Sequence, residues 1–244
     1  MTTTPAAASG IRQDQLPAAV LFDMDGTLVD TEPYWMQAET DLVAEFGGVW
    51  TQEDCLSVVG AGLWTSAEAL RARGVALEAD EIVDRLTNRV QEQIETFGAP
   101  WRPGAVELLR EVRERGIKTA LVTMSVRRMA SQIADALPFT GFDLLVTGDS
   151  VENPKPHPEA YLTAARLLGV EPECTVAIED SIPGLAAAVA AGTTAIAVPH
   201  ILQIPASDDH VLWQSLAGRT VDDLIAVYAQ RNPAERNPAE STAR

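Results

Sequence analysis

The chain has 244 residues, of which 46% are hydrophobic, and it carries a formal net charge of −17. This length fits one large domain or a core with a smaller lobe, and the apolar content is ample for a packed interior. The negative charge argues against a general nucleic-acid-binding protein, because such a protein needs a basic surface to displace the counterions of the phosphates. It does not exclude an anionic substrate, since a local cation can outweigh distant charge.

The cysteines and the apolar runs exclude other classes of protein. Cys55 and Cys174 are too few for a disulfide framework and lack a metal-ligand spacing. The N-terminus has neither the positive flank nor the apolar run of a signal peptide, and no apolar stretch has the length that spans a bilayer. We therefore expect no membrane association and a cytoplasmic location.

The N-terminal part of the chain predicts a strand followed by a long helical insertion. Residues 1–16 are small and polar and are predicted to be a disordered tail, whereas Ala19–Phe22 is typical of a buried strand. Residues 33–100 then show only helical periodicity, with two sets of apolar residues that each share one helical face. These sets are Trp35, Ala38, Leu42, Val43 and Phe46, and Ile82, Leu86, Val90, Ile94 and Phe97.

We interpret residues 33–100 as an all-helical cap lobe inserted after the first strand. Thr51 and Asp54 have the spacing of a capping box, which would open a further helix inside the lobe. The chain has to cross between the two lobes twice. Pro33 and Pro100–Gly104 are the predicted hinges.

Residues 17–32 and 101–230 are predicted to form an α/β core. Further strands are expected at Thr119–Val122, Leu144–Val146, Val176–Ile178 and Ala195–Val198. Helices are expected at 104–115, 126–137, 158–169 and 182–191, and around Val221–Ala229. Apolar strands that alternate with helices predict a parallel sheet covered on both faces.

Residues 231–244 are predicted to be a second disordered tail. They repeat the run Arg-Asn-Pro-Ala-Glu, at Arg231–Glu235 and Arg236–Glu240. Asn-Pro steps interrupt both helix and sheet. A partner-binding tail is the alternative.

Two acidic residues follow the first predicted strand, in the run Asp23-Met24-Asp25-Gly26-Thr27. Ligands of parallel sheets bind where the strands release their carboxyl ends, and Gly26 permits the sharp turn that would bring both carboxylates there. Alone, this run is a weak signal, because acidic turns are common and mostly solvated.

Polar side chains also follow the later predicted strands. The second strand ends at Thr123, with Met124 and Ser125 after it, and a hydroxyl there would donate to a phosphoryl oxygen or, for Ser125 especially, cap the next helix. Lys155 stands between two prolines after the third strand, where it presents a cation or is merely solvated. The fourth strand is followed by Glu179-Asp180, which would otherwise cap a helix.

Each feature alone could be a helix cap or a solvated surface group, but together the features predict a metal-assisted site. Four strands would deliver two aspartates, a hydroxyl, a lysine and an acidic pair to one edge of the sheet. Two unit charges about 4 Å apart repel by about 4 kcal/mol at an effective dielectric constant of roughly 20. A divalent cation and Lys155 would remove that cost, and oxygen ligands with a phosphate partner favour Mg²⁺.

The sequence resembles the haloacid dehalogenase superfamily in the order of these motifs. Its four motifs are matched by Asp23–Thr27, Thr123, Lys155 and Glu179-Asp180, within a resemblance that covers about Ala19–Pro199. The insertion is similar to the family's small helical cap. The resemblance implies a three-layer, Rossmann-like α/β core with a mobile lid, and it is strongest to sugar-phosphate and hexitol-phosphate phosphatases and more distant to β-phosphoglucomutase.

The resemblance also implies a role for each motif residue. The implied catalytic residues are Asp23, as the nucleophile, and Asp25, as the acid and base. The residues implied to bind phosphate are Thr123, Met124 and Lys155. The implied Mg²⁺ ligands are Asp23, Asp180, Glu179 and the backbone carbonyl of Asp25. Attack by a carboxylate on phosphorus gives an aspartyl phosphate, which divides one difficult displacement into two. This scheme uses no histidine, so we expect His157, His200 and His210 to be incidental.

Substrate contacts are expected from the cap. Asp30–Trp35 is similar to the corresponding segment of relatives that act on sugar or sugar-alcohol phosphates. Glu32 is therefore expected to bind a hydroxyl, and Trp35 and Trp64 are expected to stack on an apolar sugar face. Packing inside the cap is the alternative for both tryptophans.

The sequence thus predicts a monomeric, Mg²⁺-dependent phosphatase for a small phosphorylated metabolite. A phosphomutase is the first alternative, disfavoured because Trp35 and Leu63 stand where β-phosphoglucomutase-like members have a His and an Arg. A dehalogenase needs no metal and would leave Asp25 and Glu179-Asp180 unexplained. A non-catalytic protein that binds a phosphometabolite would be expected to lack the nucleophile or the acid, and this chain has both.

Overall fold

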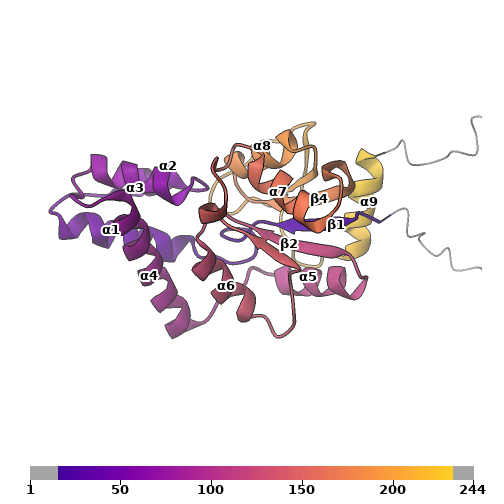
Figure 1. Cartoon of the computed structure of the whole chain (residues 1–244), viewed down its shortest axis with the longest axis horizontal. Helices are drawn as coiled ribbons and strands as arrows, with labels where there is room; N and C mark the ends of the chain where they lie inside the picture. Colours follow the sequence, from indigo (N-terminus) through magenta and orange to yellow (C-terminus); the bar gives the residue numbers. More distant parts are fainter. Residues whose placement is uncertain (1–15, 233–244) are drawn as a thin grey trace, which may run out of the picture.

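A parallel six-stranded sheet lies at the centre of the computed structural model, which describes residues 16–232 (Figure 1). Its strands are β1 (Ala19–Phe22), β2 (Lys118–Val122), β3 (Leu144–Val146), β4 (Thr175–Glu179), β5 (Thr194–Ala197) and β6 (His210–Leu212). They are ordered β3-β2-β1-β4-β5-β6. The chain order reverses direction beside β1, which is where parallel sheets of this kind bind ligands.

Strand β1 occupies the middle of the sheet and sets the register of its neighbours. Phe22 is paired with Leu121 of β2 and with Ile178 of β4. The three strands therefore release their carboxyl ends at the same level. All four residues of β1 are fully buried, as expected for a strand that is covered on both faces.

Helices cover both faces of the sheet and give it three layers (Figure 1). On one face, Val20 and Phe22 pack with α5 (Ala105–Glu114), α6 (Arg127–Asp135) and α9 (Val221–Arg231). On the other, Ala19 and Leu21 pack with α7 (Glu159–Leu168) and α8 (Ile182–Ala190). Two short 3₁₀ turns, Gly148–Ser150 and Pro172–Cys174, complete the connections.

Four helices form a separate block at one end of the molecule, on the left in Figure 1. They are α1 (Glu32–Glu45), α2 (Gln52–Val58), α3 (Leu63–Ala72) and α4 (Ala79–Phe97). The capping box expected at Thr51 and Asp54 opens α2. The apolar faces predicted for this block are buried except at their last residues, because Phe46 and Phe97 are 36% and 73% exposed.

The chain crosses between the block and the sheet along two segments that lie side by side. The Asp30 N–H donates to the carbonyl of Pro100 at 2.8 Å, and the Arg102 N–H donates to the carbonyl of Leu28 at 2.8 Å. Pro33, one of the predicted hinges, lies inside the first turn of α1, where proline is tolerated. The crossing falls just before it.

Most predicted elements are confirmed to within a few residues at each end. Strand β6 was not predicted, because it has only three half-buried residues. The predicted C-terminal tail began too early, since Arg231 ends α9. The rest of both predicted tails, 1–15 and 233–244, lies outside the described residues. Within residues 16–232, no helix has the length and apolar character needed to cross a bilayer.

We expect Gly104→Ala to destabilise the protein more than Gly116→Ala does. Both glycines have a positive φ, 84° and 73°, which costs an alanine about 1–2 kcal/mol. A Cβ at Gly104 would also overlap the carbonyl of Leu216, whereas the space around Gly116 is open. Overpacking should add about 1–3 kcal/mol at Gly104. Urea unfolding of the two variants measures the difference, and equal losses would contradict the close packing of this crossing.

Candidate active site

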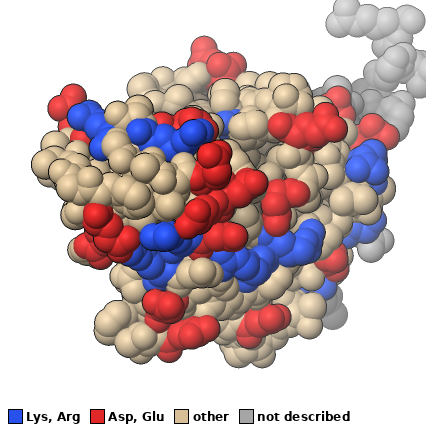
Figure 2. Space-filling model, turned by 60° about the vertical axis from the view of Figure 1, so that its left-hand side comes forward, with Lys and Arg blue, Asp and Glu red and all other residues tan. Residues whose placement is uncertain are grey.

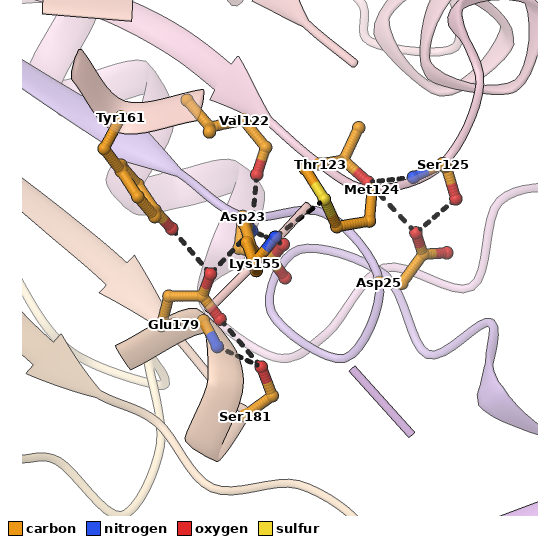
Figure 3. A network of polar contacts seen from close by, with 11 residues as sticks. Asp23, Asp25, Val122, Thr123, Met124, Ser125, Lys155, Tyr161, Glu179 and Ser181 are labelled. Atoms are coloured by element: carbon orange, nitrogen blue, oxygen red, sulfur yellow. Dashed lines mark hydrogen bonds and ion pairs between the residues drawn. The ribbon is translucent and has the colours of Figure 1, made fainter. Parts of the chain in front are cut away.

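Lys155 joins two acidic residues from different strands at the carboxyl edge of the sheet (Figure 3). Its Nζ donates to Oδ1 of Asp23 at 2.7 Å, to Oε1 of Glu179 at 2.6 Å and to the carbonyl of Val122 at 2.9 Å. The lysine is 4% exposed. Burial disfavours its charged form, but Asp23 and Glu179 outweigh that effect and raise its pKa. It is therefore a permanent cation between strands β1 and β4.

Glu179 is held by several donors besides Lys155. The hydroxyl of Tyr161, on α7, donates to Oε1 at 2.6 Å, and Ser181 donates to Oε2 at 3.2 Å. A Cβ at Gly184 would overlap this carboxylate, so the first turn of α8 needs glycine there. With both oxygens engaged by protein donors, Glu179 is arranged to hold Lys155 in place.

Asp180 completes a buried acidic group with Asp23 and Glu179. Each of the three offers one carboxylate oxygen, and these oxygens lie within 4.8 Å of one another. Gly26 makes the approach possible, because a Cβ on it would overlap the Asp180 carboxylate. Burial and the neighbouring carboxylates raise the pKa of Asp180 well above its usual range, and burial followed by Glu179 raises that of Asp23 to about 7.

The donor set of this group suits a divalent metal ion. Three buried carboxylates face one lysine, so the group has an excess of negative charge that a cation would offset. All of the ligand atoms are oxygens, which hard cations such as Mg²⁺ prefer. The side chain of Asp25 is not one of the three; the predicted ligand of Asp25 is its backbone carbonyl.

The Asp25 carboxylate instead accepts from four donors, which come from two segments of the chain. Its Oδ1 accepts from Thr31 at 2.5 Å and from the indole N–H of Trp35 at 3.1 Å. Its Oδ2 accepts from Ser125 at 2.7 Å and from Thr123 at 3.3 Å. Trp35 belongs to α1, so the carboxylate links the sheet edge with the helical block.

The residues after β2 lie where the sequence places them, with one difference. Thr123 and Met124 line the same cavity as Asp23, and the Met124 sulfur accepts from the Lys155 backbone N–H at 3.3 Å. Ser125 does not cap α6, which was the alternative considered for it. Asp149 accepts from the first N–H of that helix at 3.1 Å, and the Ser125 hydroxyl donates to Asp25 instead.

A cavity of about 70 Å³ lies between these residues and the helical block. Glu32 and Trp35, the residues predicted to contact substrate, line it. Trp64 does not, because its ring is 36% exposed and its N–H donates to Asp80 at 2.7 Å. The three histidines also lie outside the lining of this cavity; His200, for example, is within 2.7 Å of Asp30 at the chain crossing.

Two buried carboxyl groups face the cavity from α1. Burial, together with the charge of Asp25, raises the pKa of Glu32 to about 8. Burial raises the pKa of Glu39 to about 7, although the indole N–H of Trp50 donates to its Oε2 at 3.0 Å. Tyr161, Thr31 and Glu39 were not singled out from the sequence, since nothing in their spacing separates them from ordinary helix residues.

The comparisons with known proteins agree with this geometry. Residues 17–192 match a protein family described as haloacid dehalogenase-like hydrolase. A phosphorylated carbohydrates phosphatase from Thermotoga maritima is 35% identical over 178 residues, which are 71% of this chain and 81% of that protein. Hexitol phosphatase B from Escherichia coli is 32% identical over 185 residues, which are 74% of this chain and 83% of that protein.

Solved structures share the same fold. A CbbY variant from Rhodobacter sphaeroides, in complex with xylulose-(1,5)bisphosphate, has a TM-score of 0.73 and 28% identity, and the match covers 83% of this chain and 96% of that one. β-Phosphoglucomutase from Clostridium difficile has a TM-score of 0.77 at 22% identity over 88% of this chain and 98% of its own, which supports the fold alone.

Mg²⁺ should raise the thermal stability of the wild-type protein but not that of Asp180→Asn. Binding to the folded state alone at about 100 times the Kd adds about 2.7 kcal/mol, or a shift of about 5–10 °C in a protein of this size. Without metal, the variant should melt no lower than the wild type, because one of three crowded acids is gone. Asp41→Asn, an exposed acid on α1, is the control. An equal response of all three proteins would contradict the metal site.

Glu39→Gln should remove a loss of stability that occurs as the pH rises. The unfolded chain releases the Glu39 proton near pH 4.5, whereas the folded protein keeps it until about pH 7. The raised pKa therefore leaves the free energy of unfolding unchanged below pH 4.5 and lowers it as the pH rises from 4.5 to about 7. At about 1.4 kcal/mol per pKa unit, the loss is at most about 3 kcal/mol. Urea unfolding across these pH values tests this, with Asp41→Asn as control. Parallel profiles of wild type and Glu39→Gln would show that Glu39 ionises freely in the fold.

Proposed function

The chain belongs to the haloacid dehalogenase-like hydrolase family, and we propose that it is a Mg²⁺-dependent phosphatase that hydrolyses a sugar or sugar-alcohol phosphate. The observation that carries this proposal is the buried arrangement of Asp23, Lys155 and Asp180, with Asp25 beside it on one cavity. The names of the two relatives described above support the substrate class.

Asp23 is the nucleophile in this proposal. Lys155 fixes Oδ1 of Asp23, which orients the carboxylate for in-line attack on phosphorus. The new bond joins a carboxylate oxygen to phosphorus, and the bond to the leaving-group oxygen breaks, so the intermediate is an aspartyl phosphate. The ammonium also lies beside the transferring group, where fixed positive charge stabilises the transition state.

The metal would be held by Asp23 and Asp180. Glu179 would support the site as the partner of Lys155. When bound, Mg²⁺ supplies positive charge that lessens the repulsion between an anionic nucleophile and an anionic phosphate. We also propose the backbone carbonyl of Asp25 as a ligand, because Asp25 lies only two residues after Asp23 in the loop that follows β1.

Asp25 is the proposed acid and base. It gives a proton to the leaving oxygen and later takes one from the water that attacks the aspartyl phosphate. Thr123 and Ser125 hold one of its oxygens, and Thr31 and Trp35 hold the other. A substrate oxygen therefore has to replace one of these donors. Trp35 is the donor that belongs to the helical block, so it would leave Asp25 when the block moves.

The helical block acts as a cap, residues 33–100, in this proposal. The cavity of about 70 Å³ is far smaller than the roughly 300–1,000 Å³ of ligand pockets, so substrate admission requires the block to move away from the sheet. The paired segments that join Asp30 to Pro100 are the place for that motion. Closure then controls the water that reaches the aspartyl phosphate.

Within this proposal, the protein acts as a monomer on a small metabolite in the cytoplasm. The face in Figure 2 shows acidic and basic side chains interspersed, with acidic groups gathered near its centre. Such a distribution gives no support to binding of a nucleic acid backbone.

Release of phosphate from p-nitrophenyl phosphate should require both Mg²⁺ and Asp23. Asp23→Asn removes the nucleophile, and EDTA removes the metal, so each should lower the rate by at least about a thousand-fold. Asp41→Asn should retain the wild-type rate. Persistent activity in Asp23→Asn would place the nucleophile elsewhere.

The same assay with a panel of phosphate esters tests the substrate class. Hexitol, hexose and pentose phosphates should be hydrolysed with higher kcat/KM than glycerol phosphate, phosphoglycolate or nucleotides. Products are to be separated by chromatography, so that an isomerised sugar phosphate is told apart from free phosphate. A preference of orders of magnitude for phosphoglycolate or a nucleotide would refute the sugar-phosphate proposal while leaving the phosphatase intact.

A further inference from the structure

The cavity between sheet and cap has its positive charge at one end only. Its core wall includes Asp23, Lys155 and Asp180. Among the described residues that line the cavity, Lys155 alone is basic, and it is neutralised by its two carboxylate partners. The cap wall adds two more acids, Glu32 and Glu39. With the proposed Mg²⁺ bound, the countercharge for one phosphate would lie at the sheet edge, and a second anionic group at the cap end would find none.

Helix α1 presents these two acids on one face. Residues seven apart are two turns apart, or about 10 Å along the axis at about 1.5 Å per residue, and they point the same way. Trp35 and Met36 lie between them and line the same cavity. Since Glu32 lies near the catalytic carboxylates, whose charges raise its pKa, Glu39 marks the distal end.

Glu39 is not explained by the packing of the cap alone. It is 5% exposed, and its Oε2 accepts from the indole N–H of Trp50, which is 6% exposed. A buried indole N–H needs an acceptor, but a neutral side chain would serve at a lower cost than a carboxyl group in an apolar lobe. The cap also contributes Cys55, Val58, Leu63 and Ser66 to the cavity wall.

We propose that Glu39 is a specificity-determining residue, which accepts a hydroxyl from the distal end of an uncharged polyol chain and repels a second anionic group. This inference rests on the proposed function and narrows its substrate class. It assigns the site to phosphate monoesters of neutral sugars or sugar alcohols that are long enough to reach past Trp35. Bisphosphates, and phosphate esters that end in a carboxylate, are rejected.

The test compares three phosphate esters in wild type and Glu39→Gln: a hexitol monophosphate, the matched hexitol bisphosphate and glycerol phosphate. Assays are run above pH 7, because burial raises the pKa of Glu39 to about 7. The variant should lose about ten-fold or more in kcat/KM for the hexitol monophosphate, as expected for a hydrogen bond to a charged group. Glycerol phosphate is too short to reach Glu39, so its kcat/KM should not change. The ratio of bisphosphate to monophosphate kcat/KM should rise.

Two further variants separate this role from a structural one. Glu39→Asp keeps the negative charge but places the carboxylate farther from the ligand, because the side chain is one methylene shorter. Its kcat/KM for the hexitol monophosphate should fall, and it should still reject the bisphosphate. It also provides the test if Glu39→Gln does not fold, as judged by thermal unfolding. Asp41→Asn, exposed on the same helix, should match the wild type on all three esters.

The outcomes distinguish failure of this inference from failure of the proposed function. If wild type hydrolyses the esters and Glu39→Gln changes all three by one factor, or changes none, then Glu39 has only a packing role and the phosphatase proposal stands. If wild type releases phosphate from no monoester, both proposals fall together.

Discussion

The structure of the site depends on one buried ammonium group. Lys155 contacts Asp23 and Glu179 from a loop, while those acids come from adjacent strands of the sheet. Without this cation, two carboxylates about 4 Å apart would repel each other by about 4 kcal/mol per pair at an effective dielectric constant of roughly 20. The lysine therefore makes it possible for β1 and β4 to end in acids side by side. Tyr161 and Ser181 then fix Glu179, so that the position of the lysine is determined from both sides.

Lys155 does not neutralise all of the buried negative charge, and the excess negative charge is what suits the site to a metal ion. Asp180 adds a third buried carboxylate, and the raised pKa of Asp23 and of Asp180 shows how poorly the fold alone accommodates the charge. Functional sites commonly hold such unfavourable groups at the expense of stability. Gly26 and Gly184 belong to the same compromise, since larger residues at either place would push the carboxylates apart or out of the sheet edge.

The sequence predicted those parts that depend on local pattern and on parallel topology. The strand β1 and the acids after it could be read together, because a parallel sheet places all carboxyl ends at one edge. Strand β6 could not, since His210–Leu212 is short and pairs only at the margin of the sheet. Contacts between distant segments were also beyond the sequence. Ser125 has the spacing of a helix cap, and only the fold shows that Asp149 takes that place while Ser125 turns to Asp25.

The acids of α1 show why a helical residue needs its tertiary context. A glutamate on an amphipathic helix is ordinarily assigned to the solvent face, and Glu39 falls between Ala38 and Leu42, both of which are buried. Its burial follows from the packing of α1 within the cap, with one flank on the cap interior and the other on the cavity. The two ends of the cavity are thus built on opposite principles. At the sheet, acids are gathered around a cation to receive a phosphate, and in the cap, acids without a cation favour ligand groups that are neutral donors.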